Sequence, residues 1–257
     1  MKKIIKKTSL ILSVFILFIG CWVTYVTLFN IPSHILPSPL QFFSDLITNL
    51  KQGNLQEHIA TTLIEIAVGS VIGIFFGLLT GYFLAKNHFL ERIFTPYVIL
   101  IQTIPKISIA PLFLLWFGLG VESKIALVVL VVFFPIMVNF VVGIRSVDKN
   151  MQDLLQILHA NRFQKFFFVE LYYSMPSLLS GIKVASTYAI TGAVIGEMIG
   201  AKSGLGFLII LGSETYDISL ILTSVLLLSI IGLVLYKIID LVEKRLLHWS
   251  NHSEMVF

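Results

Sequence analysis

Six long apolar runs constrain this chain more than any other feature. A transmembrane helix needs about 20 mostly apolar residues to cross the hydrocarbon core of a bilayer. The runs that meet this length are residues 10–29, 63–85, 93–117, 125–144, 178–200 and 218–241. The sequence therefore predicts an all-α, polytopic membrane protein with about six transmembrane helices, organised as a single transmembrane domain over residues 1–257.

The composition agrees with a lipid environment. Of the 257 residues, 57% are hydrophobic and 12% are charged, whereas a soluble domain is nearer to half apolar and a quarter charged. The net charge of +4 does not indicate nucleic-acid binding, because basic residues in short connections orient a membrane protein. The single cysteine, Cys21, lies in the first run, which is too long for the core of a signal peptide.

The lysines and arginines between the runs predict an orientation. Thirteen of them fall on the side of the amino terminus: Lys2, Lys3, Lys6, Lys7, Lys86, Arg92, Arg145, Lys149, Arg162, Lys165, Lys237, Lys244 and Arg245. The opposite side receives only Lys51, Lys124 and Lys202. Because connections in the cytoplasm carry the excess of basic residues, we expect both termini to be cytoplasmic.

Two connections are long, and each has a helical period. Residues 39–50 predict a short amphipathic helix on the outer surface. Residues 145–177 form the longest inner connection, and apolar residues recur with helical spacing between Asp148 and Val169. This second stretch is too short and polar to span a bilayer. It is either an interfacial helix on lipid or a helix that inserts apolar side chains into a groove of a soluble partner.

The 145–177 loop carries a recognisable pattern. In order it contains Asp153, Leu154, Leu155, His159, Ala160, Phe166, Val169, Leu171, Tyr172 and Pro176. The spacing resembles the cytoplasmic loop of permease subunits of binding-protein-dependent, ATP-binding-cassette (ABC) importers. That loop reads Glu-Ala-Ala, three residues, Gly-Ala, then Phe, an aliphatic-x-Leu-Pro and a second Pro. His159 replaces its glycine, a residue that would permit a tight turn, and Tyr172 replaces its first proline.

Other segments resemble one branch of that family. They are Gln102-Thr103-Ile104-Pro105-Lys106, Ala110-Pro111-Leu112, Trp116-Phe117-Gly118-Leu119-Gly120, Gly196-Glu197-Met198-Ile199-Gly200 and Gly204-Leu205-Gly206. The branch imports sulfonates such as taurine, nitrate-like anions and aromatic precursors of thiamine. The resemblance covers nearly the whole chain. It implies the type I (MetI-like) architecture, a place in the bacterial plasma membrane, and a small anionic or aromatic solute.

The resemblance also implies partners. In the family, two permease copies pair across the membrane, each loop helix docks on a separate ATP-binding ABC ATPase, and an extracytoplasmic substrate-binding protein delivers the solute. The expected coupling helix comprises Asp153, Leu154, Leu155, Leu158, His159, Ala160, Arg162, Phe163, Phe166 and Pro176, with the leucines and phenylalanines as docking side chains. Arg162 and Lys165 either pair with acidic groups of the partner or form a solvated basic face.

Glycines recur at four-residue steps in two runs. Gly69, Gly73, Gly77 and Gly81 share one helical face in the second run, and Gly192, Gly196 and Gly200 share one in the fifth. Such stripes let a neighbouring helix approach closely. We expect helix packing in the second run. Gly192 and Gly196 are helix-packing candidates as well, but in the fifth run we also favour movement or pore lining, because Glu197 lies among its glycines.

Two ionisable residues are candidates for the translocation path. Glu197 lies at the end of the fifth run, where a charge is expensive and by default functional; alternatively it pairs with Lys202 at the outer interface. Lys106 lies between Pro105 and Pro111, which we expect to break the third run. Broken helices line cavities in transporters, so Lys106 would attract an anionic solute there or extend to an interface.

Motifs for catalysis and cofactors are absent from the sequence. It contains no Gly-x-x-x-x-Gly-Lys-Ser/Thr phosphate loop, no His-Glu-x-x-His, no paired cysteines and no Gly-x-Ser-x-Gly. We therefore expect no catalytic residues, no metal, no cofactor, and ATP hydrolysis on a partner subunit. A secondary transporter or a vitamin-binding membrane component is the alternative, although neither explains the Phe166 to Pro176 spacing. A membrane-embedded enzyme would need clustered His, Asp or Glu residues in its spans.

Overall fold

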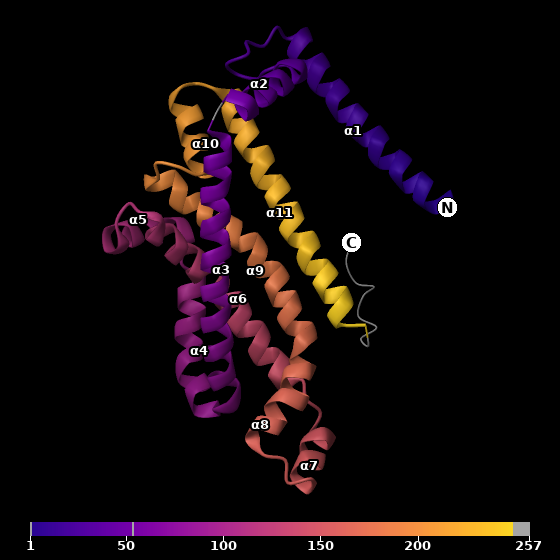
Figure 1. The fold of residues 1–257 in the computed structure, drawn as a ribbon, viewed down its shortest axis with the longest axis vertical. Helices are drawn as coiled ribbons and strands as arrows, with labels where there is room; N and C mark the ends of the chain where they lie inside the picture. The colour runs from indigo at the N-terminus through magenta and orange to yellow at the C-terminus, as the bar shows by residue number, and fades with distance from the viewer. Residues whose placement is uncertain (1, 53, 249–257) are drawn as a thin grey trace.

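The structure is a computed structural model that describes residues 2–52 and 54–248, with the side chains of residues 2–12, 15 and 52 also outside the description. Within this range all regular elements are helices (Figure 1). The long ones are α1 (Lys2–Leu28), α3 (Leu55–Lys86), α6 (Val121–Arg145), α9 (Leu171–Gly200) and α11 (Ile218–Leu246). The shorter ones are α2 (Pro39–Gln52), α4 (His88–Thr103), α5 (Lys106–Phe117), α7 (Lys149–Ile157), α8 (Arg162–Lys165), the π-helical turn η1 (Phe166–Glu170) and α10 (Leu205–Glu214).

The all-α, polytopic architecture is confirmed. Four helical segments are long and apolar enough to cross a membrane, namely α3, α6, the stretch Arg162–Gly200 and α11, and a fifth results if α4 and α5 count as one bent span. The remaining predicted span, 10–29, falls in α1 apart from its last residue. Within α1, the segment Ile16–Leu28 is apolar but is shorter than a full membrane span.

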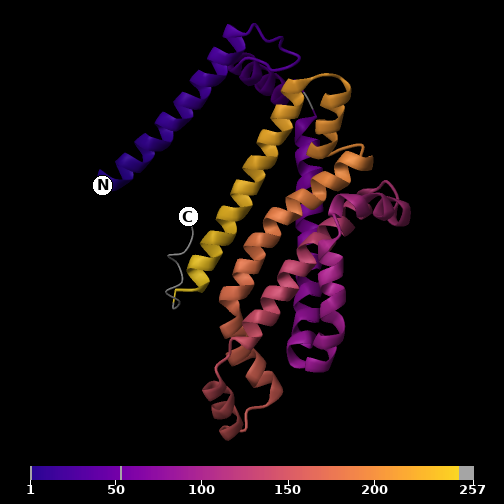
Figure 2. The same cartoon turned by 180° about the vertical axis from the view of Figure 1, so that it is seen from behind.

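The core of the molecule is the contact of α6 with α3 on one side and α9 on the other (Figures 1 and 2). The glycine stripe of α3 faces α6 residues that are also four apart. A Cβ atom at Gly73 would lie 2.9 Å from the Cβ of Val132, and one at Gly77 would lie 2.9 Å from the Cβ of Ile136. The glycines therefore let the backbone of α3 approach α6 closely.

The glycines of α9 contact α6 as well. A Cβ atom at Gly192 would lie 2.8 Å from Val131 Cγ2, and one at Gly196 would lie 2.9 Å from Lys124 Cγ. Both glycines are buried in this helix interface. Both glycines therefore pack against α6, and the movement or pore lining that we also favoured for this run stays a prediction.

The third predicted span is broken once, at a bend of 97° between α4 and α5. Ile104 has an extended backbone (φ −66°, ψ 129°) because the residue before a proline is disfavoured in the helical region. Pro111, in contrast, lies inside α5, so the expectation that both prolines break the span is wrong for the second. A proline interior to a helix loses one backbone bond but keeps a helical φ, and Ala110, which is fully buried, anchors α5 to the core.

The two ends of the long axis differ. One end, here the loop end, bears α7 and α8; the other, the α10 end, bears α10 and α2 (Figure 1). The predicted helix at 39–50 is confirmed as α2, and its Asp45 carboxylate accepts a hydrogen bond from Ser219 at the start of α11 (2.6 Å). α1 stands apart from the other long helices in both views (Figures 1 and 2). The prediction that both termini are cytoplasmic concerns in part residues 1 and 249–257, which lie outside the described residues.

Candidate functional site

The 145–177 loop contains two helices, whereas its sequence predicted one periodic stretch. α7 ends at Ile157 because His159 adopts a positive φ of 49°. The amide of His159 donates to the carbonyl of Gln156 and that of Ala160 donates to the carbonyl of Leu155, both at 3.0 Å. These two bonds form the Schellman motif that ends many helices, usually with glycine at the left-handed position. His159 thus occupies the site at which the importer pattern has its glycine.

A second helix starts immediately after this turn. The side chain of Asn161 accepts from the Gln164 amide (2.8 Å), and the Gln164 side chain accepts from the Asn161 amide (3.0 Å). This reciprocal capping box begins α8. The loop is therefore ordered by local hydrogen bonds on both sides of the His159 turn.

Replacing His159 by glycine is expected to stabilise the protein. A left-handed backbone costs a residue other than glycine about 1–2 kcal/mol, and part of this cost disappears in His159→Gly. The thermal unfolding midpoint in detergent should rise. His88→Gly is the matched control, because His88 begins α4, lies outside the positive-φ positions and pairs with Glu91; an equal rise there, or none at position 159, would contradict the prediction.

The loop presents an apolar face to its surroundings. Leu154 and Ile157 on α7 and Leu158 directly after it are 46%, 74% and 65% exposed, and Phe163 on α8 is 70% exposed. On an α-helix, residues three and four apart share a face, which is why Ile157 and Leu158 accompany Leu154. Ile157 and the exposed Phe168 were not among the predicted docking side chains. The i, i+3 spacing from Leu154 would have identified Ile157.

Two predicted docking side chains face the other way. Leu155 lines a cavity of about 230 Å³ between the loop and the ends of α3 and α6. Phe166 packs edge to face on Tyr82 of α3, with 4.9 Å between ring centroids. Successive residues of a helix are about 100° apart, so Leu155 cannot share the exposed face of Leu154. Leu155 and Phe166 therefore attach the loop to the membrane-spanning helices.

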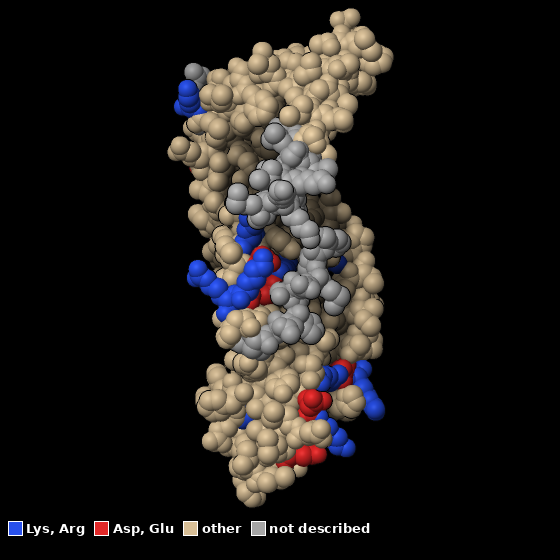
Figure 3. Space-filling view, turned by 90° about the vertical axis from the view of Figure 1, so that its right-hand side faces the viewer, with Lys and Arg blue, Asp and Glu red and all other residues tan. Residues whose placement is uncertain are grey.

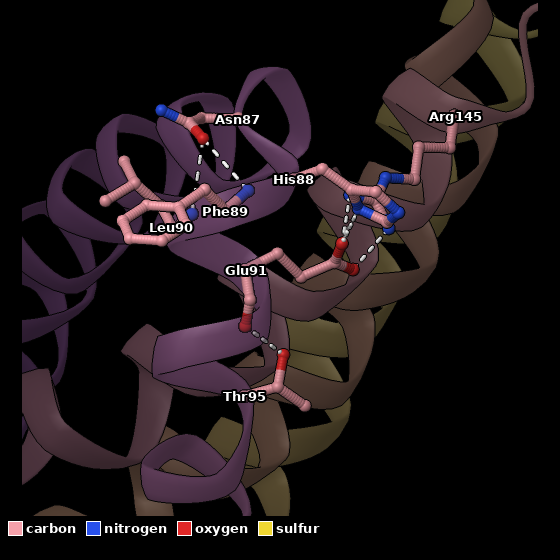
Figure 4. A network of polar contacts seen from close by, with 7 residues as sticks. All are labelled: Asn87, His88, Phe89, Leu90, Glu91, Thr95 and Arg145. Atoms are coloured by element: carbon pink, nitrogen blue, oxygen red, sulfur yellow. Dashed lines mark hydrogen bonds and ion pairs between the residues drawn. The ribbon is translucent and has the colours of Figure 1, made fainter.

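Ion pairs fasten the loop end to the spans. Arg145, the last residue of α6, binds both carboxylate oxygens of Glu91 on α4, and the Nη2 to Oε2 distance is 2.7 Å (Figure 4). His88 Nδ1 lies 2.7 Å from the same carboxylate. A second pair joins Lys86 at the end of α3 to Glu170 in η1. None of these acidic residues was predicted from the sequence, although each is an acid among the basic residues that define this end.

Charge also joins α9 to α11. Lys183 of α9 pairs with Asp240 (3.0 Å) and with Glu243 of α11. Lys244 pairs with Asp240 at 2.6 Å.

On the face seen in Figure 3, charged side chains gather in the half toward the loop end, and most of the opposite half is uncharged.

Glu197 lies in a buried polar cluster at the α10 end. Its side chain is 1% exposed; Oε1 accepts from the Thr62 hydroxyl (2.5 Å) and Oε2 accepts from the Gly206 amide (2.6 Å). The Leu205 amide in turn donates to Thr62 Oγ1 (2.9 Å). Glu197 thereby holds the first turn of α10 against α3. Among the described residues no ion pair joins it to Lys202, so the alternative of a simple surface pair is not found.

Two further charged groups are buried beside this cluster. Lys124, predicted in an outer loop, lies in the first turn of α6, and its ammonium donates to the carbonyls of Leu119 (2.6 Å), Gly120 (2.9 Å) and Gly200 (3.1 Å). The Gly200 carbonyl ends α9, where the last carbonyls lack donors within the helix, and Lys124 supplies one of them with a donor. Glu65 of α3 is 1% exposed, and its Oε2 has no hydrogen-bond partner within the described part of the chain.

Lys106 belongs to a separate network. It is the first residue of α5, after Pro105, and its ammonium donates to the carbonyl of Gln102 near the end of α4. A lysine in this position satisfies a carbonyl freed by the bend. The structure does not join Lys106 to the Glu197 cluster by any described contact, and a role of either residue in solute transport stays a prediction.

Residues 69–248 match the family described as the binding-protein-dependent transport system inner membrane component. The chain belongs to this family. It is thus a transmembrane permease subunit of an ABC importer and a multi-pass inner membrane protein, as the loop pattern predicted. The assignment decides against the secondary-transporter and vitamin-binding alternatives.

Individual relatives of this permease define its branch. It is 36% identical over 229 residues to the riboflavin transport system permease RibX of Chloroflexus aurantiacus, covering 89% of this chain and 85% of that protein. It is 33% identical over 218 residues to the formylaminopyrimidine transport permease ThiX of Halalkalibacterium halodurans (85% and 87%). Identity to the taurine permease TauC of Escherichia coli is 28% over 239 residues (91% and 86%). The predicted branch is confirmed.

A solved structure shares the fold of this permease. A chain of the MetNI methionine ABC transporter, in inward-facing conformations, superposes with a TM-score of 0.67 over 75% of this chain and 95% of that chain. Sequence identity is 19%, so the likeness shows the fold alone. The MetI-like architecture expected from the sequence is confirmed.

Proposed function

We propose that this permease imports a small heteroaromatic or anionic solute and is driven by a separate ABC ATPase that docks on α7. The observation that carries the docking site is the exposed apolar face of Leu154, Ile157 and Leu158. α7 has nine residues, too few to cross a bilayer, so this face lies outside the hydrocarbon core. An amphipathic helix that fits its apolar face into a groove is a recurring mode of recognition.

The loop end is proposed to face the cytoplasm. Support comes from the basic residues that this end carries in the helices described, among them Lys86, Arg92, Arg145, Lys149 and Arg162, against Lys51, Lys124 and Lys202 toward the other end. Cytoplasmic connections carry this excess. The ion pairs of Arg145 and Lys86 then lie where the docked ATPase would move the loop.

Labelling of single cysteines tests the orientation. In a Cys21→Ser background, Lys202→Cys should react with a membrane-impermeant maleimide on intact cells, because Lys202 is exposed at the α10 end. Gln156→Cys on α7, which is also exposed, should react only after permeabilisation. The reverse pattern would show that the loop end is outside and would rule out the ATPase as its partner.

The substrate class is inferred from the relatives. Among the relatives named for a solute, those for riboflavin and formylaminopyrimidine are 36% and 33% identical, whereas the taurine permease is at 28%. This order favours a heteroaromatic solute over a sulfonate. We assign the specificity mainly to the proposed extracytoplasmic binding protein.

A second permease copy is proposed to complete the membrane unit. α1 stands apart from the other long helices (Figure 1), and Leu17, Phe18 and Tyr25 are 68%, 61% and 54% exposed. Apolar side chains on an isolated helix need cover from lipid or from another protein chain. A homodimer with lipid around it provides both.

Transport in proteoliposomes tests the proposed function. With its ATPase and binding protein, the permease should take up labelled riboflavin or a formylaminopyrimidine only when ATP is present on the loop-end side. Taurine is the matched comparison solute. Uptake that persists without the ATPase, or that follows an ion gradient, would contradict the proposal, and faster uptake of taurine would overturn the substrate class alone.

A further inference from the structure

An open groove runs along the loop end of the spans. Its volume is about 590 Å³. α3 contributes Phe75, Leu79 and Tyr82 to the wall, while Phe163 and Phe166 close it from the loop side. The remaining lining residues are leucine or phenylalanine, with the single exception of Arg162. The groove therefore combines an apolar wall with one cation.

Arg162 is the charge available to a ligand in this groove. It is exposed, and within residues 2–52 and 54–248 it takes part in no ion pair. Lys86 is another basic residue near the wall, and its ammonium lies 5.8 Å from the centre of the Tyr82 ring. Lys165, next to Phe166, lines the neighbouring cavity of about 230 Å³ instead. Lys86 is already neutralised by Glu170. A ligand with a negative group would therefore meet Arg162 first.

The wall extends into the span. Phe75 and Tyr82 are seven residues apart on α3, which corresponds to about 10 Å at 1.5 Å per residue. Tyr82 lies one turn before Lys86, the last residue of α3. Along the membrane normal the groove thus begins with a guanidinium at the water boundary and continues as an apolar wall at the depth of the hydrocarbon.

We propose that the groove binds an anionic phospholipid, with its phosphate on Arg162 and an acyl chain along Phe75 and Leu79. A guanidinium binds phosphate oxygens through paired hydrogen bonds, and basic pockets between transmembrane helices on the cytoplasmic side bind anionic head groups. A water-soluble protein would not extend about 10 Å into the span. The inference rests on the proposed membrane placement, but not on the ATPase or the solute.

The bound lipid would connect two parts of the permease. Its acyl chain contacts α3, and its head group contacts α8, which belongs to the 145–177 loop. The lipid then holds the loop against the spans, in addition to the Lys86 to Glu170 pair. Anionic lipid content would therefore influence how firmly the loop is attached.

Native mass spectrometry tests the lipid site. Purified permease is mixed with equal amounts of phosphatidylglycerol and phosphatidylcholine, and retained lipid is counted. The wild type should retain phosphatidylglycerol in preference, and Arg162→Gln should reduce this retention at least fivefold. Arg92→Gln is the matched control, because Arg92 is an exposed arginine of α4 that does not line the groove; it should retain the lipid as the wild type does.

Three results would overturn the lipid proposal. The first is equal retention of both lipids, and the second is an equal loss in the Arg92 control. The third is a disulfide-linked dimer of Leu79→Cys in a Cys21→Ser background, which would show that a second copy covers the groove. Each result leaves ATPase docking on α7 intact, and loss of docking in turn leaves lipid retention intact, so the two proposals fail separately.

Discussion

A permease carrying Ile157→Asp and Leu158→Asp is expected to lose its ATPase during copurification. Both side chains lie on the exposed face of α7, 74% and 65% exposed in the isolated chain. Burial of one such side chain contributes about 1.5–3 kcal/mol, and about 1.4 kcal/mol corresponds to a tenfold change in affinity. Removing both should weaken binding about a hundredfold or more. The measurement is the amount of ATPase that a tagged permease retains from detergent extracts.

Gln156→Asp is the control for added charge on the same helix. Gln156 is exposed but lies about 200° around the helix from Leu154, at 100° per residue, and therefore outside the apolar face. It should retain the ATPase. If the double variant elutes as a monodisperse protein and still binds the ATPase as the wild type does, α7 is not the docking helix. If the wild type itself retains none, the docking proposal fails altogether.

Gly73→Leu is expected to have the largest effect on folding. Even a Cβ atom at this position would lie 2.9 Å from Val132 Cβ and 3.1 Å from the carbonyl oxygen of Val129. The second neighbour is backbone and cannot rotate away. Overpacking costs about 1–3 kcal/mol in a well-packed core, and here the whole α3 to α6 contact must separate. We expect little monodisperse protein after extraction and a lower unfolding midpoint in what remains.

Gly20→Leu provides the matched comparison. Gly20 lies in α1, and apart from its own helix backbone no heavy atom of the described residues lies within 4 Å of an added Cβ, so this variant should be recovered at the wild-type level. Gly73→Ala is a smaller test that keeps the measurement possible if the leucine variant does not fold; it should lower the midpoint less than leucine would. Normal stability of Gly73→Leu would show that the α3 to α6 contact is looser than the structure indicates.

Most of the fold could be predicted from apolar run lengths, but its tertiary contacts could not. Runs such as 63–85 and 125–144 are set by hydropathy along the chain, which is a local property. That Gly73 faces Val132 depends on the rotation of two helices that no single-sequence pattern specifies. The bend at Pro105 was predictable because proline acts on its immediate neighbour. The continuity of α5 through Pro111 was not, because a proline keeps a helical φ and can lie inside a helix as well as end one.

The sequence predicted where the candidate site lies in the chain, but not which of its side chains are exposed and which are buried. The period of the loop indicated a helix and an apolar face, yet it assigned Leu155 to the exposed side and missed Ile157. The turn at His159 separates two helices whose periods happen to continue one another in the sequence. Glu197 was correctly singled out as unusual, but its partners Thr62 and Gly206 come from segments remote in the chain or across a turn. Such partners can be identified only in three dimensions.

The pairing of Arg145 with Glu91 links the movement of α4 to that of α6. No residue of α4 is fully buried, so its packing against the rest of the chain is limited and the Arg145 pair is its main polar attachment to α6. Arg145 donates two hydrogen bonds to Glu91 in the first turn of α4. It also lies four residues before the start of α7. A pull on α7 would therefore tilt α4 as well as α6. A displacement of α7 by the proposed ATPase would therefore also reach α4, and with it the bend at Pro105.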